Sequence, residues 1–159
     1  MFFIGSAGCE GFINVSPKGM DTLKILDKNR VVWLNHTGSG NETSTHVQEN
    51  GRMTIMWCSF DKKPLILKFY GKAKVIHERD EAWDKMCGYF DGFVGVRQFF
   101  DMEVELVLTS CGFGVPRMKY VGERNGLIKW ADAKGREGMK EYWAEKNMLS
   151  LDGEDTGIF

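Results

Sequence analysis

The sequence has few of the residues that mark metal or redox proteins. It contains 3 histidines and 3 prolines in 159 residues, and its 4 cysteines form no Cys-x-x-Cys pair. A zinc ribbon and a dithiol redox motif are therefore excluded, and the histidines do not have the spacing of metal ligands. We expect no metal site.

Neither an excess of one charge nor a long apolar run is present. Lys and Arg together number 21 against 22 for Asp and Glu, a formal net charge of −1, which leaves no general basic surface for nucleic acid. Charged residues or glycine interrupt every hydrophobic stretch before it is long enough to span a bilayer. Residues 1–6 lack the basic region of a signal peptide. We expect a soluble, cytoplasmic protein with reduced thiols that binds neither nucleic acid nor a membrane.

Glycine is the residue present in excess. The 19 glycines are about 12% of the chain, against a usual share of about 7%. With so little proline, this excess indicates tight turns, bulges and close approaches of the backbone. The length is that of one ordinary domain, so residues 1–159 are predicted to form a single domain.

Short segments with strand character follow one another along the chain. They are rich in apolar, β-branched or aromatic residues and are bounded by turn residues. These segments are 2–6, 11–16, 22–26, 30–35, 52–60, 65–77 and 102–108. Helical spacing is found at 41–50, 79–90 and 136–147. Because the helical crossovers that parallel strands require are mostly missing, we predict a mainly β fold, an antiparallel barrel with a few peripheral helices.

Residues 37–43, Thr-Gly-Ser-Gly-Asn-Glu-Thr, form a glycine-rich loop before a predicted helix. Small residues let backbone N–H groups approach a phosphate, and the helix would point its positive end at the same place. No Lys follows the glycines, and Thr43 stands where a dinucleotide fingerprint has its third glycine. An ordinary glycine turn with Asn41 as helix cap is the simpler interpretation of this segment alone, and an anion site is the alternative.

Three other features are candidates for chemistry. Residues 14–19 end a strand in a proline turn that presents Ser16 and Lys18 together, so that Lys18 either contacts a phosphate or polarised ring or is solvated. Residues 109–116 have alternating glycines typical of a bulge or of close packing on a flat group, and Cys111 there is more simply a buried, inert thiol than a nucleophile. Trp33 is either a core residue or the wall of a planar ligand site.

Read together, several motifs resemble one known family. The segments are 11–19 (Gly-Phe-Ile-Asn-Val-Ser-Pro-Lys-Gly), 30–34 (Arg-Val-Val-Trp-Leu), 38–43 and 50–54. They resemble the pyridoxamine 5′-phosphate oxidase-like FMN-binding split-barrel family. Segments 110–116, 145–147 and 150–153 are similar to the carboxyl half of an uncharacterised branch of it. The resemblance implies a six-stranded antiparallel split barrel, a homodimer, and FMN bound at the subunit interface.

The resemblance also implies a set of cofactor-binding residues. The strand beginning at Arg30 matches the flavin strand, residues 13–16 with Lys18 lie near the ring, and the glycine loop holds the phosphate. The implied set is Ile13, Asn14, Val15, Ser16, Lys18, Arg30, Trp33, Leu34, Ser39, Asn41, Glu42 and Thr43. The pyridoxamine phosphate oxidases have a Ser-Arg-Lys triplet where this chain has Asn41-Glu42-Thr43, so two positive charges are absent here.

The resulting expectation is an FMN-dependent oxidoreductase that acts on a small-molecule substrate. Lys18 is the expected catalytic residue, because its ammonium can stabilise negative charge that develops on flavin or substrate. The Arg and Ser residues with which the true oxidases hold the substrate phosphate have no clear match, which argues against vitamin B6 oxidation. The alternatives are a flavin-binding or sensing module without turnover, and a split barrel that uses deazaflavin or haem.

Overall fold

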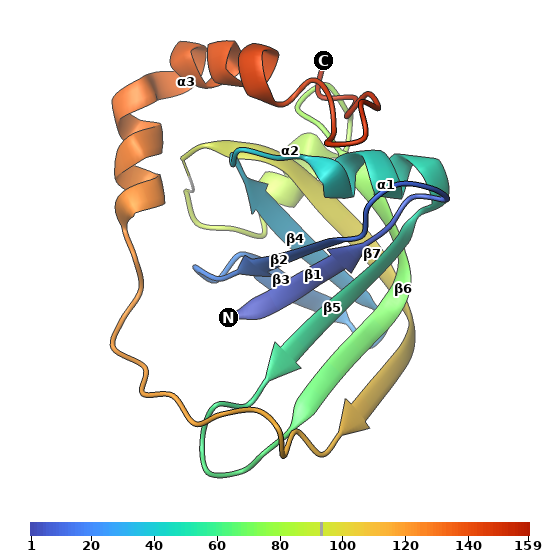
Figure 1. Ribbon diagram of the computed structural model, residues 1–159. Helices are drawn as coiled ribbons and strands as arrows, with labels where there is room; N and C mark the ends of the chain where they lie inside the picture. Colours follow the sequence, from blue (N-terminus) through green and yellow to red (C-terminus); the bar gives the residue numbers. More distant parts are fainter. Residues whose placement is uncertain (93) are drawn as a thin grey trace.

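The computed structural model describes residues 1–92 and 94–159. Seven strands form one antiparallel sheet in the order β2-β1-β5-β6-β7-β4-β3 (Figure 1). The strands are β1 (Phe2–Ser6), β2 (Asn14–Lys18), β3 (Leu23–Asp27), β4 (Arg30–His36), β5 (Arg52–Cys58), β6 (Ile66–Ile76) and β7 (Val96–Ser110). The helices are α1 (Glu42–Asn50), α2 (Trp83–Cys87) and α3 (Gly126–Lys146).

The mainly β fold is confirmed, but the expected six-stranded barrel is wrong in its strand count and its closure. The sheet has seven strands, and its terminal strands β2 and β3 are not paired with each other in the described part of the chain. The chain turns between them at Met20 and Asp21, both of which have positive φ. After this turn β3 pairs with β4, whereas β2 pairs with β1.

Strand β4 is buried on both of its faces. Val31 and Trp33 point into the main core, and the alternate residues Val32 and Leu34 belong to a second core that includes Met86 of α2. This two-sided burial explains why the strand reads as a continuous apolar run. It also fixes Trp33 in the middle of the strand that leads into the glycine loop.

The long β6 and β7 strands pair along most of their length around a bulge. Their register shifts between Tyr70 and Gly71. A Cβ at Gly71 would lie 1.9 Å from the backbone oxygen of Glu103, so the two backbones approach each other more closely than any side chain allows. Such a bulge lets a long pair of strands bend around a core.

The carboxyl third of the chain leaves the sheet and then returns to α1. Helix α3 is divided at Gly135, which has φ 65° and ψ 179°, and the predicted helix 136–147 corresponds to its second part. The final residues lie against α1, where the Thr156 carbonyl accepts hydrogen bonds from Ser44 Oγ and Gln48 Nε2, each at 2.7 Å. The end of α3 is thereby held on the same side of the sheet as α1 (Figure 1).

Several predicted elements differ in extent from the structure. The strand predicted at 11–16 is β2 at Asn14–Lys18, so Pro17 lies within the strand and opposite Phe3, and the predicted proline turn is wrong. Proline is tolerated there because β2 is at the edge of the sheet.

Strand β7 begins at Val96 rather than at residue 102, because Phe99 and Phe100 are buried on opposite faces and hide the alternation. The predicted helix 79–90 contains only the short α2, flanked by turns. No helix within the described residues is both long and apolar enough to cross a membrane.

Candidate functional site

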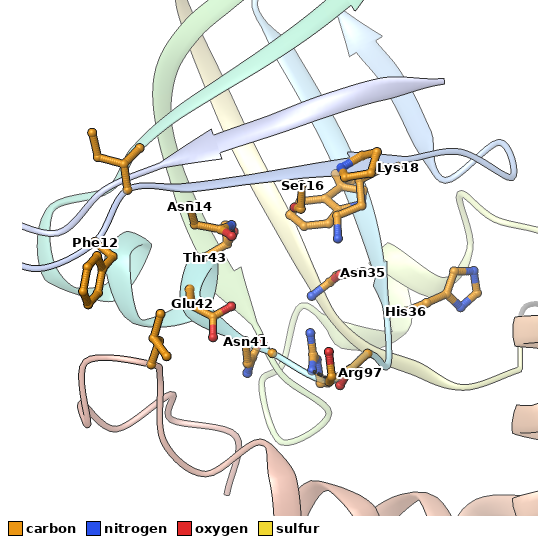
Figure 2. Close-up of a pocket in the computed structure, with 17 residues that line it drawn as sticks. Phe12, Asn14, Ser16, Lys18, Asn35, His36, Asn41, Glu42, Thr43 and Arg97 are labelled. Carbon is orange, nitrogen blue, oxygen red and sulfur yellow. Dashed lines mark hydrogen bonds between the residues drawn. The ribbon is translucent and has the colours of Figure 1, made fainter.

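A cavity of about 570 Å³ lies between β2, the end of β4 and the start of α1 (Figure 2). It is lined by Phe12, Ile13, Asn14, Ser16, Pro17, Lys18, Trp33, Asn35, His36, Gly38, Ser39, Gly40, Asn41, Glu42, Thr43, Arg97 and Leu151. Its volume is within the range of roughly 300–1,000 Å³ of cofactor and small-molecule sites. The fold thus brings together the two polar segments, 14–19 and 37–43, that the sequence singled out separately.

Most of the predicted cofactor residues line this cavity. They are Ile13, Asn14, Ser16, Lys18, Trp33, Ser39, Asn41, Glu42 and Thr43. Val15 does not line it, because alternation along β2 exposes its side chain. Leu34 is buried in the second core. Arg30 lies at the opposite end of β4, where its guanidinium pairs with Asp101 at 2.6 Å and lines a different cavity.

The start of α1 forms one end of the cavity. Asn41 occupies the cap position, but its side chain makes no capping hydrogen bond. Instead, the Asn41 amide exchanges two hydrogen bonds with the Gln98 amide, at 2.7 and 3.3 Å. The predicted side-chain cap is therefore absent from this helix, whose positive end faces the cavity.

The Thr43 hydroxyl is oriented by two neighbouring side chains. Its oxygen accepts hydrogen bonds from Ser6 Oγ at 3.2 Å and from Asn14 Nδ2 at 3.0 Å. Ser6 Oγ also lies 3.0 Å from His46 Nδ1, and when that nitrogen donates to Ser6, the single proton of the Thr43 hydroxyl is available. Thr43 is thus prepared to donate to an acceptor in the cavity.

Lys18 and Trp33 form another part of the wall. The Lys18 Nζ lies 5.2 Å from the centre of the Trp33 ring, within the range of a cation–π contact, and Trp33 in turn stacks on Phe100 at 4.6 Å. Burial, together with the charge of Arg97, lowers the pKa of Lys18 to about 8, although Glu42 opposes this shift. The result is an ammonium group beside a rigid aromatic surface.

Arg97 is the second cation of the cavity, and only 4% of its surface is exposed. Its Nη1 donates to the Asn147 Oδ1 at 2.8 Å and to the Gly38 carbonyl at 3.3 Å. When the Asn35 amide is oriented so that both its oxygen and its nitrogen have partners, its oxygen accepts a hydrogen bond from Arg97 Nη2 at 3.0 Å. Burial lowers the pKa of Arg97 to about 10, so the group is still cationic at neutral pH.

Asn147 ties the end of α3 to the glycine loop. Its side chain is completely buried, and its Nδ2 donates to the carbonyls of Gly38 at 3.0 Å and Ser39 at 3.2 Å. One turn earlier in α3, Trp143 Nε1 donates to Thr37 Oγ1 at 2.8 Å. The loop conformation therefore depends on residues more than 100 positions away in the sequence.

Sequence reasoning missed Asn35, Arg97 and Asn147 as site residues. Asn35 had a weak signal, since it is a polar residue at the end of a buried strand. Asn147 appeared only as part of the motif 145–147. Arg97 had no signal at all, because an isolated Arg before an apolar pair is indistinguishable from a surface residue until the strand is placed.

The segment 109–116 lies outside the cavity. Gly112 has φ +67°, and a Cβ there would lie 2.9 Å from the backbone nitrogen of Leu65, so this glycine packs closely on the backbone of another segment. Cys111 is exposed, so the simpler expectation of a buried thiol is wrong.

Comparison with known proteins identifies the family. No family model matches the sequence. The chain is 35% identical over 174 residues to the pyridoxamine 5′-phosphate oxidase family protein ustO of Aspergillus flavus, and the match covers 96% of this chain and 69% of that protein.

Solved structures agree on the fold. HupZ of Group A Streptococcus superposes with a TM-score of 0.53 at 17% identity, over 74% of this chain and 89% of that chain. An FMN-binding protein from Syntrophomonas wolfei also gives 0.53, at 12% identity, over 68% and 75% of the two chains. At such identities these structures support the fold alone. The 35% identity to the Aspergillus flavus protein, over most of both chains, shows that this chain belongs to the pyridoxamine 5′-phosphate oxidase family.

Proposed function

We propose that this protein binds FMN in the cavity beside α1 and is an oxidoreductase with a small-molecule substrate. The main support for the proposal is the arrangement of this cavity. The start of α1, which has no side-chain cap, lies at one end of the cavity, and Lys18 and Trp33 form another part of its wall. When bound, FMN supplies hydride or electron transfer, whereas the protein supplies binding, orientation and electrostatics.

The residues at the α1 end suit the FMN phosphate. The helix dipole favours an anion there, and Thr43 offers its hydroxyl proton. The Glu42 side chain folds back over Gly40, since a Cβ at Gly40 would lie 2.5 Å from the Glu42 carboxylate. Because Gly40 has no side chain, the Glu42 carboxylate can pack directly against the loop backbone.

Thr43→Val is expected to weaken FMN binding about tenfold. The substitution keeps the size of the side chain but removes the hydroxyl, and a hydrogen bond to a charged group contributes about 1.5 kcal/mol or more. The dissociation constant is measured by quenching of flavin fluorescence. Thr45→Val, two residues further along α1 and outside the cavity, is the control and should bind like wild type. Equal FMN affinity in the Thr43 and Thr45 variants would remove the phosphate assignment.

Lys18 has a proposed role in turnover rather than in retention. Lys18→Ala is expected to lower turnover by at least tenfold while changing FMN affinity less, because the ammonium matters most when negative charge develops. Since the pKa of Lys18 is lowered to about 8, the positive charge is lost as pH rises through 8. Wild-type turnover should therefore fall above pH 8, and the variant should lack that fall.

Lys28→Ala, in an exposed turn, is the matched control for Lys18→Ala and should retain both turnover and its pH profile. A Lys18 variant that loses FMN and turnover in equal proportion would assign the lysine to cofactor binding instead.

We also propose that two copies of the chain associate. Apolar side chains are exposed on the end of β7 at Leu106, Val107 and Leu108, and on the following segment at Phe113 and Val121, the last being 91% exposed. Exposed apolar surface of this extent is typical of an interface, and the family resemblance implies a homodimer with FMN at its interface. Light scattering should give about twice the chain mass of 18.1 kDa. A monomer at micromolar concentration would contradict this proposal.

The cytoplasm is the proposed compartment, since the four cysteines are free thiols and cytosolic conditions keep thiols reduced.

Anaerobic mixing of the FMN-loaded protein with NADH, NADPH or pyridoxamine phosphate tests the enzymatic part of the proposal. Bleaching of the flavin spectrum by one of them supports an oxidoreductase. A bound flavin that remains oxidised with every donor would favour a binding or sensing module. A protein that takes up deazaflavin or haem in preference to FMN would move the cofactor assignment to that group.

A further inference from the structure

A chain of buried polar side chains lies behind the cavity wall at the start of α1. Thr43 and His46 are three residues apart on α1, so they share one face of the helix. Ser6, at the end of β1, is hydrogen-bonded to both of them. Only 5%, 3% and 6% of the surfaces of Thr43, His46 and Ser6 are exposed. Buried polar groups are stable only when they are hydrogen-bonded, and these three bond to one another.

The Ser6 hydroxyl is the central member of this polar chain. Its oxygen lies 3.2 Å from Thr43 Oγ1 and 3.0 Å from His46 Nδ1. Thr43 lines the cavity beside α1 and also accepts a hydrogen bond from Asn14, which lies next to it in Figure 2. The polar chain therefore leads from the cavity wall, through one hydroxyl, to an imidazole behind the wall.

The polar chain has two possible directions, because each hydroxyl has a single proton to donate. In one direction His46 Nδ1–H donates to Ser6, Ser6 donates to Thr43, and the Thr43 proton points into the cavity. In the other direction Ser6 donates to His46 Nδ1 and Thr43 donates to Ser6, so no proton remains for a ligand. The proton on His46 thus decides whether Thr43 donates to a bound group.

The second ring nitrogen of His46 does not fix the position of that proton. His46 lines a second cavity of about 720 Å³, as does Gly8. A Cβ at Gly8 would lie 3.6 Å from His46 Cδ2, the ring atom next to Nε2, so this edge of the ring faces the second cavity. Among residues 1–92 and 94–159, Ser6 is the hydrogen-bond partner of the ring, through Nδ1, and Nε2 has none. Which imidazole nitrogen is protonated depends on the hydrogen bond of the other, so the Ser6 side decides.

We infer that His46 is a positioning residue for the FMN phosphate: when the phosphate occupies the start of α1, His46 carries a proton on Nδ1 and directs the Ser6 and Thr43 protons toward it. This inference rests on the proposed function and assigns part of phosphate binding to a residue behind the cavity wall. Only this direction of the polar chain offers the anion a proton, and the resulting charge-assisted hydrogen bond is stronger than a neutral one. Donors arranged in line also polarise one another.

Nitrogen-15 NMR of protein labelled at histidine tests the inference on the wild type. Protonated and unprotonated imidazole nitrogens give well-separated signals, and those of His46 are assigned by through-bond correlation to its backbone amide. With saturating FMN, Nδ1 should have the chemical shift of a protonated nitrogen. An unprotonated Nδ1 in the FMN complex would overturn the inference.

Two replacements of equal size at His46 test the direction of the polar chain through affinity. The amide of His46→Asn can donate to Ser6 in place of Nδ1, whereas the carboxylate of His46→Asp only accepts. His46→Asn is therefore expected to bind FMN within about twofold of wild type, and His46→Asp about tenfold more weakly. Both should bind riboflavin, which has no phosphate, like wild type. Equal losses for FMN and riboflavin would make His46 a merely structural residue and overturn the inference.

The Thr43→Val background separates the polar chain from simple charge repulsion. Without the Thr43 hydroxyl, the difference in FMN affinity between His46→Asn and His46→Asp should shrink by about threefold or more. A difference of unchanged size would mean that the carboxylate repels the phosphate directly, with no part for Ser6 and Thr43.

Inorganic phosphate added to FMN-free protein keeps this result separate from the proposed function. A protein that refuses FMN, but in which phosphate protonates His46 Nδ1, would retain the polar chain and lose the flavin. If neither FMN nor phosphate gives a protonated Nδ1, the inference is overturned. These spectra of the wild type decide the question if the His46 variants do not fold.

Discussion

Replacing Asn147 by alanine is expected to cost about 2–4 kcal/mol of folding free energy and to weaken FMN binding more than tenfold. The completely buried amide donates to the carbonyls of Gly38 and Ser39 and accepts from Arg97. Its removal leaves several buried polar groups without partners, each at a cost of about 1–3 kcal/mol. The glycine loop also loses its connection to α3. Chemical unfolding and flavin titration measure the two effects.

Asn125→Ala is the matched control for Asn147→Ala. Asn125 precedes the other end of α3, is exposed, and makes no capping hydrogen bond. Its replacement should change stability by less than about 0.5 kcal/mol. If Asn147→Ala were as stable as Asn125→Ala and bound FMN as tightly as wild type, α3 would have no part in shaping the site.

Gly71→Ala is expected to cost more than about 3 kcal/mol, within the range known for severe backbone clashes and overpacking. The added Cβ would lie 1.9 Å from the Glu103 oxygen and 3.0 Å from its carbonyl carbon. Backbone atoms on both sides cannot yield as a flexible side chain can, so β6 and β7 must separate at the bulge. Unfolding in urea measures the loss.

Gly114→Ala provides the comparison for Gly71→Ala, since a Cβ at Gly114 meets nothing within 4 Å. Its stability should equal that of wild type within about 0.5 kcal/mol. A Gly71→Ala protein with wild-type stability would mean that β6 and β7 are not held as closely as the bulge requires.

The local part of the site was predictable from the sequence, and the long-range part was not. Residues 14–18 and 37–43 carry their signal in consecutive positions: polar residues with a lysine in a short strand, and a glycine loop before a helix. Arg97 and Asn147 act only because β7 and α3 return to the loop, with contacts across 50 to 109 residues. Nothing in their immediate sequence distinguishes them from exposed polar residues.

The same division applies to the fold. The strand Phe2–Ser6 and the end of α1 at Asn50 were predicted correctly, and Gly51 after the helix has the positive φ of a helix terminator. Arg30 was predicted to lie beside a phosphate because its strand matched the flavin strand of the family. The structure instead places Arg30 at the opposite end of β4, where it pairs with Asp101. A strand match gives the neighbours of a residue in sequence but not the end of the strand at which the cavity opens.

Titration of the purified, cofactor-free protein with FMN tests the central claim most directly. The cavity beside α1 predicts saturable, equimolar binding with micromolar or tighter affinity, seen as quenching of flavin fluorescence and weakened by Thr43→Val. A protein that stays colourless after purification and leaves the fluorescence of added FMN unchanged would contradict the claim.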